Sequence, residues 1–303
     1  MTRRSFLLCR RPHHPVTIPA FSVINSTCNE SLTKPCSCPQ LKANSYLCNM
    51  KISLSVVIIT FNEERNIGRC IDSVRDIADD IVVIDSFSED RTKEICLEKG
   101  VRFIEHAFEG HIQQKNFAIT QAAYPHVLSL DADEAPNEIL CDNIRKVKEN
   151  FEADGYTMNR LTNYCGHWVR HCGWYPDRKL RLWDSRKGQW TGLNPHDRYE
   201  MEPGSVIKHL QGDLLHYSYY TREDHLKQIQ KFTDILAKSM FDTGRRTSWP
   251  GIIAATVFKF IRDYFLKLGI LDGKAGFTIS WLSAGASFKK YRKLLLLQNN
   301  IPQ

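Results

Sequence analysis

The chain has 303 residues, of which 42% are apolar and 25% are charged, a composition that suits a globular domain with appendages. Its net charge of +7 conceals a segregation, because residues 1–49 carry +5, residues 50–244 carry −6 and residues 245–303 carry +8. The basic ends contain no recognisable nucleic-acid-binding motif, so nucleic-acid binding is not expected. Two interpretations remain: the basic residues contact an anionic membrane, or they form a solvated surface.

Residues 1–49 are rich in Pro, Ser, Asn and Cys and have no helical or strand period. This pattern predicts a disordered tail. A second interpretation is that Met50 is the true start and that the preceding residues are translated upstream sequence. On both interpretations we expect the fold to begin near Lys51, where a clean strand pattern starts.

Cysteine usage and apolar runs indicate the compartment. Five of the ten cysteines precede Met50 and five follow it, and the later five stand singly, which favours a reduced, cytosolic protein. The apolar run from Phe6 to Cys9 is shorter than the ~7 to 15 residues of a signal peptide, and no stretch reaches the ~18 uncharged apolar residues of a membrane span. We expect a cytoplasmic protein that does not cross a bilayer.

From Lys51 onward, apolar strands alternate with helices. We expect strands at residues 54–60, 81–85, 101–105 and 127–130, and helices at residues 65–77, 90–100, 113–123 and 137–150. Strands that are apolar on both faces and separated by helices indicate a parallel α/β sheet of Rossmann type with both faces covered. Ligands of such a sheet lie beyond the carboxyl ends of its strands, where Thr60, Asp85 and Asp131 stand.

After residue 150 the pattern changes to a loop-rich segment with four tryptophans, and then to helices expected at residues 221–243, 250–268 and 274–297. Trp174 and Trp190 can stack on a sugar or belong to the core. Arg178 and Arg181 can reach a diphosphate or cover a solvated strand. We interpret His209 and His216 as structural hydrogen-bonding residues.

The last 60 residues combine apolar and basic side chains. From Pro250 to Leu268 the apolar residues recur on one side, and Lys289, Lys290, Arg292 and Lys293 adjoin Leu294 to Leu297. This pattern is typical of a helix on an anionic membrane surface, although a helix packed within the molecule has a similar one.

A dense acidic motif ends the fourth expected strand. In LSLDADE, an apolar strand delivers Asp131, Asp133 and Glu134 within four residues. Carboxylates so close together repel each other unless a cation neutralises them, and Mg²⁺ or Mn²⁺ binds oxygen ligands of this kind beside a substrate's phosphates. The alternative is a capped turn into the helix near Asn137, where acidic residues favour the helix dipole.

Four stretches stand in the order and spacing of family 2 glycosyltransferases: VVIITFNEERNIGRCIDSV, IVVIDSFSEDRT, QKNFAI and LSLDADE. The resemblance covers nearly everything after Met50. Through CGWYPDRKLRLW, GDLLHYSY and LDGKAGF it looks like the bacterial subgroup that contains lipopolysaccharide core β-glucosyltransferases. It implies a GT-A (Rossmann-like, nucleotide-diphospho-sugar transferase) domain at residues 50–220 and a helical, basic, amphipathic C-terminal region at residues 221–303.

The resemblance also implies an activity. It is the inverting transfer of a sugar from a nucleotide-diphosphate donor, a UDP-sugar, to a cell-envelope glycan or glycolipid, for which we expect lipopolysaccharide core. Because a lipid-linked acceptor is met at the bilayer, we expect a protein that is peripheral on the inner face of the cytoplasmic membrane.

Position by position, the resemblance assigns the nucleotide-binding residues. Thr60, Asn62 and Glu64 resemble first-strand residues that line the base and ribose. Asp85 matches the aspartate that accepts a hydrogen bond from the uracil imide. Lys115 lies where a basic residue commonly approaches the donor.

Asp131 and Asp133 match the two aspartates of the family's metal motif. The resemblance places Asp131 near the donor as well, and it makes Asp133 the stronger candidate for the ligand of the Mg²⁺ or Mn²⁺ that bridges the diphosphate. The chemistry agrees, because a diphosphate leaving group develops negative charge that a divalent cation stabilises.

Inversion requires a base opposite the leaving group. In the resembling subgroup a carboxylate follows a histidine after a tryptophan-glycine segment, and this chain has WTGLNPHD ending at Asp197. Where relatives commonly show His-Glu, this chain shows His-Asp, so the shorter side chain must come closer to the acceptor. The alternative is a Pro-His-Asp surface turn, in which case Asp177 or Glu200 is the next candidate base.

Three rival functions remain open at the sequence level. A polyprenyl-phosphate sugar synthase shares the sheet and the metal motif but usually lacks CGWYPD and LDGKAGF. A haloacid-dehalogenase-type phosphatase places its acidic motif on the first strand, whereas three strands precede LSLDADE here. A degenerate sugar-nucleotide-binding protein is disfavoured by the intact Asp85, Asp131, Asp133 and Asp197.

Overall fold

The computed structural model describes residues 51–193 and 196–299, and the expectation about residues 1–49 lies outside the described residues. The strands are β1 (Leu54–Thr60), β2 (Asp80–Asp85), β3 (Arg102–Glu105), β4 (His126–Asp131), β5 (Glu134–Pro136), β6 (Gly155–Tyr164), β7 (His167–Trp168), β8 (Asp177–Asp184), β9 (Gly188–Leu193), β10 (His196–Met201) and β11 (Ile207–Tyr219). The helices are α1 (Ile67–Val74), α2 (Thr92–Glu98), α3 (His111–Thr120), α4 (Glu138–Glu149), α5 (Arg222–Asp242), α6 (Trp249–Ile261) and α7 (Gly273–Asn299), with short helical turns η1 (Ser185–Lys187), η2 (Arg262–Leu266) and η3 (Gly269–Asp272).

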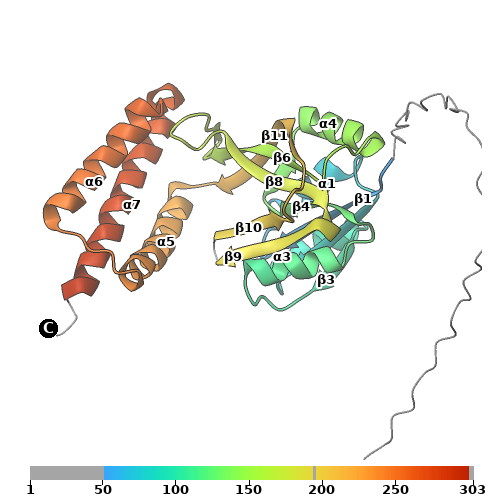
Figure 1. The fold of residues 1–303 in the computed structure, drawn as a ribbon, viewed down its shortest axis with the longest axis horizontal. Coiled ribbons are helices and arrows are strands. Elements are labelled where there is room, and N and C mark those ends of the chain that lie inside the picture. Colours follow the sequence, from blue (N-terminus) through green and yellow to red (C-terminus); the bar gives the residue numbers. More distant parts are fainter. Residues whose placement is uncertain (1–50, 194–195, 300–303) are drawn as a thin grey trace, which may run out of the picture. The chain divides into compact units, whose positions relative to one another are not determined.

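The first half of the sheet is the expected parallel α/β unit. Its strands lie in the order β3-β2-β1-β4, all parallel (Figure 1). The register pairs Thr60 with Asp85 and Ile59 with Asp131, so the carboxyl ends of three strands meet at one edge. The expected strand positions are confirmed to within one residue. The apolar runs of β1, β2 and β4 bury both faces, whereas the short β3 is partly exposed.

The second half of the sheet corrects the expectation of a loop-rich segment. Beyond β4 the order continues β8-β6-β11-β5, with β8 antiparallel to both β4 and β6 and β11 parallel to β6. The segment therefore contains the longest strands of the described chain, β6 and β11. Their polar residues interrupt the apolar runs by which a strand is recognised, since one end of these strands faces a charged site.

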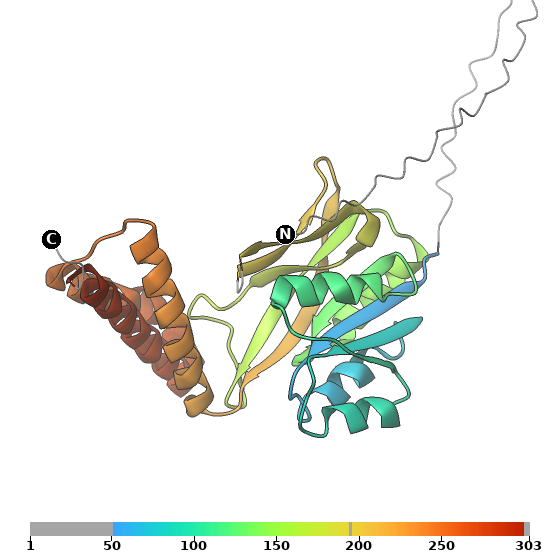
Figure 2. The ribbon, with the colours of Figure 1, turned by 90° about the horizontal axis from the view of Figure 1, so that it is seen from below.

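Two apolar layers cover the parallel strands. On one face α1, α2 and α4 contribute Ile67, Ile71, Cys96, Leu140 and Ile144 to a cluster with Val56, Ile58 and Leu130. On the other face Ala118 of α3 packs with Val57, Val82 and Ile84, and Figure 2 shows α3 and the helices α1 and α2 on opposite sides of β1. Asn137 caps α4 by accepting a hydrogen bond from the Leu140 amide at 2.9 Å.

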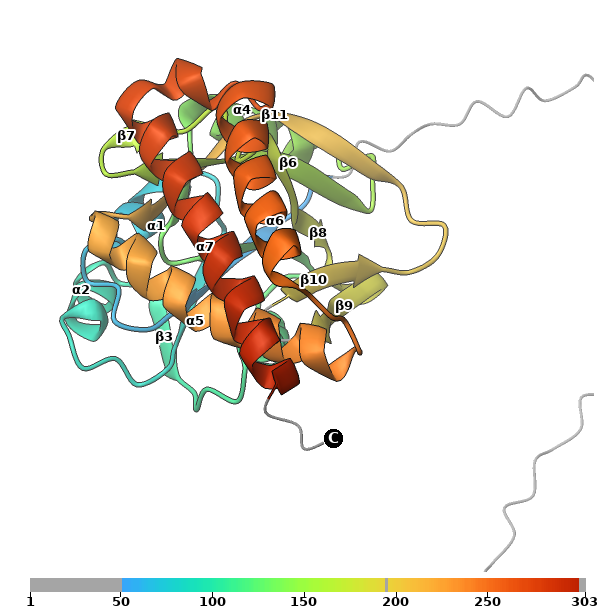
Figure 3. The same cartoon turned by 90° about the vertical axis from the view of Figure 1, so that its left-hand side faces the viewer.

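Three helices follow the sheet. Helix α5 begins with a capping box between Thr221 and Asp224. The single helix expected at residues 250–268 is instead α6 and a π-helical turn η2, after which the chain reverses through Leu268, which has a positive φ of 55°. Helices α6 and α7 run side by side with α5 against them (Figure 3). No helix within residues 51–193 and 196–299 is long and apolar enough to span a membrane.

Asp272 of η3 joins the helices to the sheet. Its carboxylate accepts hydrogen bonds from the backbone amides of His171 at 2.8 Å and Arg170 at 3.4 Å, both in the loop after β7. Behind this contact, Val169 and Cys172 pack against Ile279 of α7. The LDGKAGF segment therefore forms the joint between the last helix and the long strands.

Candidate active site

Two loops at the carboxyl edge of the sheet are hydrogen-bonded to each other. The amide of Asn62 donates to Ser88 Oγ at 2.7 Å, and the side chain of Asn62 accepts from the Glu89 amide at 2.8 Å. The Glu64 amide donates to Asp90 Oδ2 at 3.0 Å. Asn62 has a φ of 54°, a conformation that asparagine adopts more readily than most residues. Asn62 and Glu64 therefore hold the β1–α1 and β2–α2 loops together.

Thr60 and Asp85 lie side by side at the ends of β1 and β2. Both are buried, and both oxygens of Asp85 accept hydrogen bonds from Ser88, at 2.7 Å from its amide and 2.5 Å from its hydroxyl. Thr60 Oγ1 is buried and has no hydrogen-bond partner among the described residues. A ligand placed here therefore meets a free hydroxyl and a carboxylate that retains acceptor capacity.

Lys115 of α3 joins two carboxylates from distant parts of the chain. Its Nζ lies 2.8 Å from Asp197 Oδ2 and 3.3 Å from Asp131 Oδ1. The ammonium also lies 4.4 Å from the centre of the Trp190 ring, a distance typical of a cation–π contact. Because Lys115 is buried, its charge depends on these neighbours.

Arg181 of β8 neutralises the other side of Asp131. Its Nη2 donates to Asp131 Oδ2 at 2.8 Å and to Glu134 Oε1 at 2.6 Å. Burial by itself raises the pKa of Asp131, but Lys115 and Arg181 hold it well below its usual range. Asp131 therefore stays ionised at every physiological pH.

Asp133 faces a histidine of β11. Its Oδ2 lies 3.1 Å from His216 Nε2, and His216 Nδ1 lies 3.3 Å from Thr162 Oγ1. His216, which the sequence analysis interpreted as structural, is thus beside the acidic motif. The stretch GDLLHYSY, which contains His216, resembles the family, but the resemblance gives His216 no role, and its nearness to Asp133 depends on the pairing of distant strands.

The residues present fit a hard divalent cation. Asp131 Oδ1 is buried and forms no hydrogen bond with the described residues, although the Lys115 ammonium lies 3.3 Å away, and Asp133 presents its carboxylate next to an imidazole. No group of three or more His, Cys, Asp or Glu side chains within residues 51–193 and 196–299 is arranged as a complete metal site. Oxygens of a bound diphosphate are the ligands that would complete the coordination of Mg²⁺ or Mn²⁺.

The two tryptophans that could stack on a sugar differ in burial. Trp190 is buried against Trp183 and Tyr199, with ring centroids 5.7 Å apart in each pair. Trp174 packs edge-on against Tyr164 at 6.0 Å. Trp190 therefore belongs to the core, whereas the half-buried Trp174 also lines a cavity, so for Trp174 both interpretations stay open.

A polar cavity of about 360 Å³ adjoins the site. His216, Thr162 and the salt-bridged pair of Arg160 and Asp177 line it, with Trp174 and Tyr219 as walls. Arg160 donates to Asp177 Oδ2 through both Nε (3.0 Å) and Nη2 (2.7 Å). The cavity lies on the long strands, beyond the acidic motif, where an acceptor substrate has room.

Residues 55–201 match the family described as Glycosyl transferase family 2. The chain therefore contains a domain of this family. The strand order β3-β2-β1-β4, the acidic motif at the end of β4 and the added antiparallel strands give the family 2 domain its GT-A fold. This assignment removes the haloacid-dehalogenase alternative.

Two relatives cover most of the chain. A lipopolysaccharide core biosynthesis glycosyltransferase, LpsC, of Rhizobium meliloti is 26% identical over 259 residues, which are 80% of this chain and 94% of LpsC. An uncharacterized glycosyltransferase of Rickettsia typhi is 27% identical over 261 residues, which are 82% of this chain and 89% of the relative.

Among solved structures, glucosyl-3-phosphoglycerate synthase from Mycobacterium tuberculosis, in complex with Mn²⁺, uridine diphosphate and glucosyl-3-phosphoglycerate, aligns with a TM-score of 0.32 and 20% identity. The alignment covers 37% of this chain and 44% of that chain, so this chain spans less than half of that structure.

Proposed function

We propose that this glycosyltransferase transfers a sugar, with inversion, from a UDP-sugar to a glycolipid or glycan of the cell envelope, of the lipopolysaccharide core type. The observation that carries the proposal is that Lys115 joins Asp131 and Asp197 at the carboxyl edge of the sheet, with Asp133 two residues after Asp131. The similarity to LpsC supports the acceptor class.

In this proposal the nucleotide lies over the ends of β1 and β2. The unpartnered Thr60 hydroxyl and the remaining lone pairs of Asp85 bind the base and ribose. Asn62 and Glu64 contribute by fixing the two loops that line this position.

The diphosphate lies beside Asp131, Asp133 and His216, which would hold Mg²⁺ or Mn²⁺. The cation would supply charge neutralisation for the departing diphosphate. Lys115 adds a buried positive charge on the same side. Arg181 keeps Asp131 ionised and fixed in place.

Asp197 is the proposed base, and Lys115 controls it. The Lys115 ammonium is 2.8 Å from the Asp197 carboxylate. A bound diphosphate attracts the same ammonium, which leaves the carboxylate available to accept the acceptor hydroxyl's proton. The acceptor approaches from the cavity that Arg160, Asp177 and His216 line.

The C-terminal helices suit an interface with a bilayer. Large apolar side chains are exposed along α6, η2, η3 and α7: Trp249, Ile253, Val257, Phe258, Phe265, Leu266, Leu271, Phe277 and Trp281. An exposed apolar surface with flanking Lys and Arg is typical of peripheral membrane proteins. It supports a location on the inner face of the cytoplasmic membrane, where a lipid-linked acceptor is accessible.

A panel of nucleotide sugars with Mg²⁺ or Mn²⁺ tests the proposal by nucleotide release, with membrane glycolipid extract, polyprenyl phosphate or no acceptor. We expect release that depends on the cation and on glycolipid, and a loss of orders of magnitude in Asp133→Asn, which keeps the side-chain volume but removes the charge. Undiminished activity in excess chelator contradicts the cation's role. Release that requires polyprenyl phosphate instead supports the synthase alternative.

A further inference from the structure

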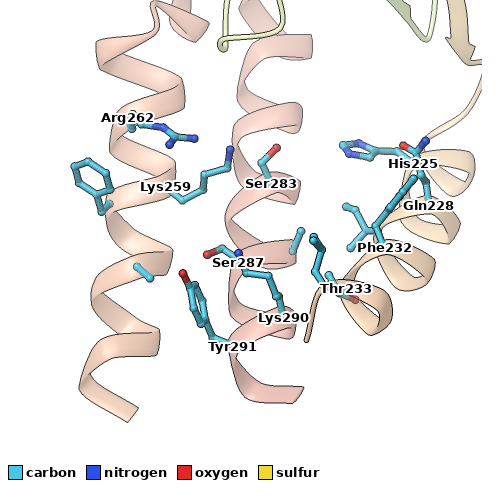
Figure 4. A pocket seen from close by; sticks show the side chains of 15 residues that line it. His225, Gln228, Phe232, Thr233, Lys259, Arg262, Ser283, Ser287, Lys290 and Tyr291 are labelled. Carbon is cyan, nitrogen blue, oxygen red and sulfur yellow. The ribbon is translucent and has the colours of Figure 1, made fainter. Parts of the chain in front are cut away.

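The helical region contains a second cavity, which shares the lining residue Gln228 with the polar cavity beside the sugar-transfer site. It has a volume of about 430 Å³, within the range of small-molecule sites, and lies among α5, α6 and α7 (Figure 4). Cationic, hydroxyl and apolar side chains all line it, so its chemistry differs from that of an ordinary gap between packed helices.

Three basic side chains line the cavity. Lys259 and Arg262 extend from the α6 side toward α7, and Lys290 extends from α7 close to Tyr291 (Figure 4). Asp263 accepts from both Lys259, at 2.7 Å, and Arg262, at 2.9 Å, so one carboxylate serves two cations. The cluster retains a net positive charge.

Lys290 has no carboxylate partner among the described residues, and its Nζ lies 4.4 Å from the centre of the Tyr291 ring. Burial, together with the neighbouring Lys259 and Arg245, lowers the pKa of Lys290. An anion in the cavity would reverse this effect, because it would replace like-charge repulsion by attraction.

The remaining lining is amphiphilic. Phe232 and Leu236 of α5 and Phe258 of α6 provide apolar walls, and the hydroxyls of Ser283 and Ser287 lie on α7 between the cationic side chains. Phe258 is also 59% exposed and so continues the cavity into the apolar surface of α6. Free phosphate gains nothing from apolar walls. A lipid carries its phosphate next to its acyl chains, which can pack against such walls.

We propose that the cavity among α5, α6 and α7 binds the phosphate headgroup of an anionic membrane lipid, with Lys290 as the principal cationic contact. The proposal rests on the proposed membrane docking, and it adds a defined site to that surface. The lipid phosphate pairs with Lys290 and with the Lys259–Arg262 pair, the serine hydroxyls donate to its oxygens, and the first acyl carbons lie against Phe232 and Phe258.

Calorimetric titration of the full chain with dihexanoyl phosphatidic acid, below its micelle concentration, tests the site. Dihexanoyl phosphatidylcholine and inorganic phosphate serve as comparison ligands. We expect Lys290→Gln to weaken phosphatidic acid binding about ten-fold or more, as loss of a charge-assisted hydrogen bond does, and Lys290→Arg to retain it. Lys289→Gln, the same charge change on the adjacent exposed residue outside the cavity, should bind like wild type.

Equal binding by Lys290→Gln and Lys289→Gln overturns the proposal. Inorganic phosphate that binds as tightly as phosphatidic acid overturns the assignment to a lipid, and phosphatidylcholine that binds as tightly overturns the assignment to an anionic headgroup. The titration contains no nucleotide sugar and therefore tests lipid binding alone. If the proposed sugar transfer is wrong, the wild type releases no nucleotide in the separate activity assay. Thermal unfolding of each variant checks that the helices remain folded, and we expect the melting temperatures to agree within about 2 °C.

Discussion

Lys115 links the two chemical roles that the sequence assigns to separate motifs. Its ammonium contacts the metal-motif carboxylate Asp131 and the candidate base Asp197 at once. Loss of one partner from a buried ion pair leaves an uncompensated charge, which is costly. A diphosphate that attracts Lys115 would therefore free the carboxylate of Asp197, the candidate base.

The role of Asp197 is tested by Asp197→Asn. General-base assistance typically contributes ~10² to 10⁴ in rate, so the transfer rate at saturating donor and acceptor should fall by about that factor. Donor affinity should change little, in contrast to Asp133→Asn. Asp197→Glu restores the His-Glu pair of the resembling subgroup and should keep partial activity. If Asp197→Asn works within a few-fold of wild type, the base is elsewhere, and Asp177 and Glu200 are the next positions to test.

Glu63, in the β1–α1 loop, carries an unusual carboxyl. Burial raises its pKa from 4.5 to about 7, although a hydrogen bond from Asn66 opposes the shift. The folded chain thus holds this proton more tightly than the unfolded chain. Its contribution to the free energy of unfolding is greatest below pH 4.5 and decreases, by up to about 3 kcal/mol, as the pH rises to 7.

Glu63→Gln keeps the hydrogen bond from Asn66 but removes the titration. In chelator, the variant should gain melting temperature relative to wild type as the pH rises from about 5 to 8, at roughly 2–4 °C per kcal/mol. Thermal unfolding at several pH values measures this difference. A difference that stays constant across the range shows that the Glu63 carboxyl titrates as it does in the unfolded chain.

Among the contacts between elements, Asp272 of η3 stabilises the packing of the C-terminal helices against the loop after β7. Besides two backbone amides, Asp272 contacts the imidazoles of His171 at 3.1 Å and His167 at 3.4 Å. Burial raises the pKa of Asp272, but these hydrogen bonds hold it below its ordinary value. Its stabilisation is therefore complete at neutral pH and is lost as the pH falls through the lowered pKa.

Asp272→Asn should destabilise the protein by about 1–3 kcal/mol, because a buried set of donors loses a charged acceptor. The expected fall in melting temperature is a few degrees at pH 7 and becomes smaller at acid pH. Asp242→Asn, at the exposed end of α5, is the matched control and should stay within about 0.5 kcal/mol of wild type. Equal melting temperatures for the two variants show that the joint contributes no stability.

At the scale of the whole molecule, the charge segregation and the exposed apolar residues of α6 and α7 act together. Each basic residue near an anionic surface contributes ~1 kcal/mol, so a few of them hold a protein reversibly. Cosedimentation should be stronger with vesicles that contain phosphatidylglycerol than with phosphatidylcholine alone, and it should weaken as salt shortens the Debye length. Equal cosedimentation with both vesicles counts against electrostatic docking.

The parallel half of the fold and the order of the motifs could be predicted from the sequence alone. Strands β1, β2 and β4 bury both faces, so their apolar runs are continuous and their carboxyl-terminal Thr60, Asp85 and Asp131 are visible at once. Helix positions were also predictable to within a few residues, because the apolar period and caps such as Asn137 are local.

Which polar residues contact one another could not be predicted before the chain's three-dimensional packing was known. Strands β6, β8 and β11 carry charged residues toward the site, which hides their strand character, and their pairing brings Arg181 to Asp131 and His216 to Asp133 across long stretches of chain. The cavity at Lys290 likewise depends on three helices that contact one another only after folding. The local apolar period of a helix or strand shows which of its own faces is buried. The partner of a buried charge, in contrast, depends on which distant residues the sheet register and the helix packing bring within a few ångströms.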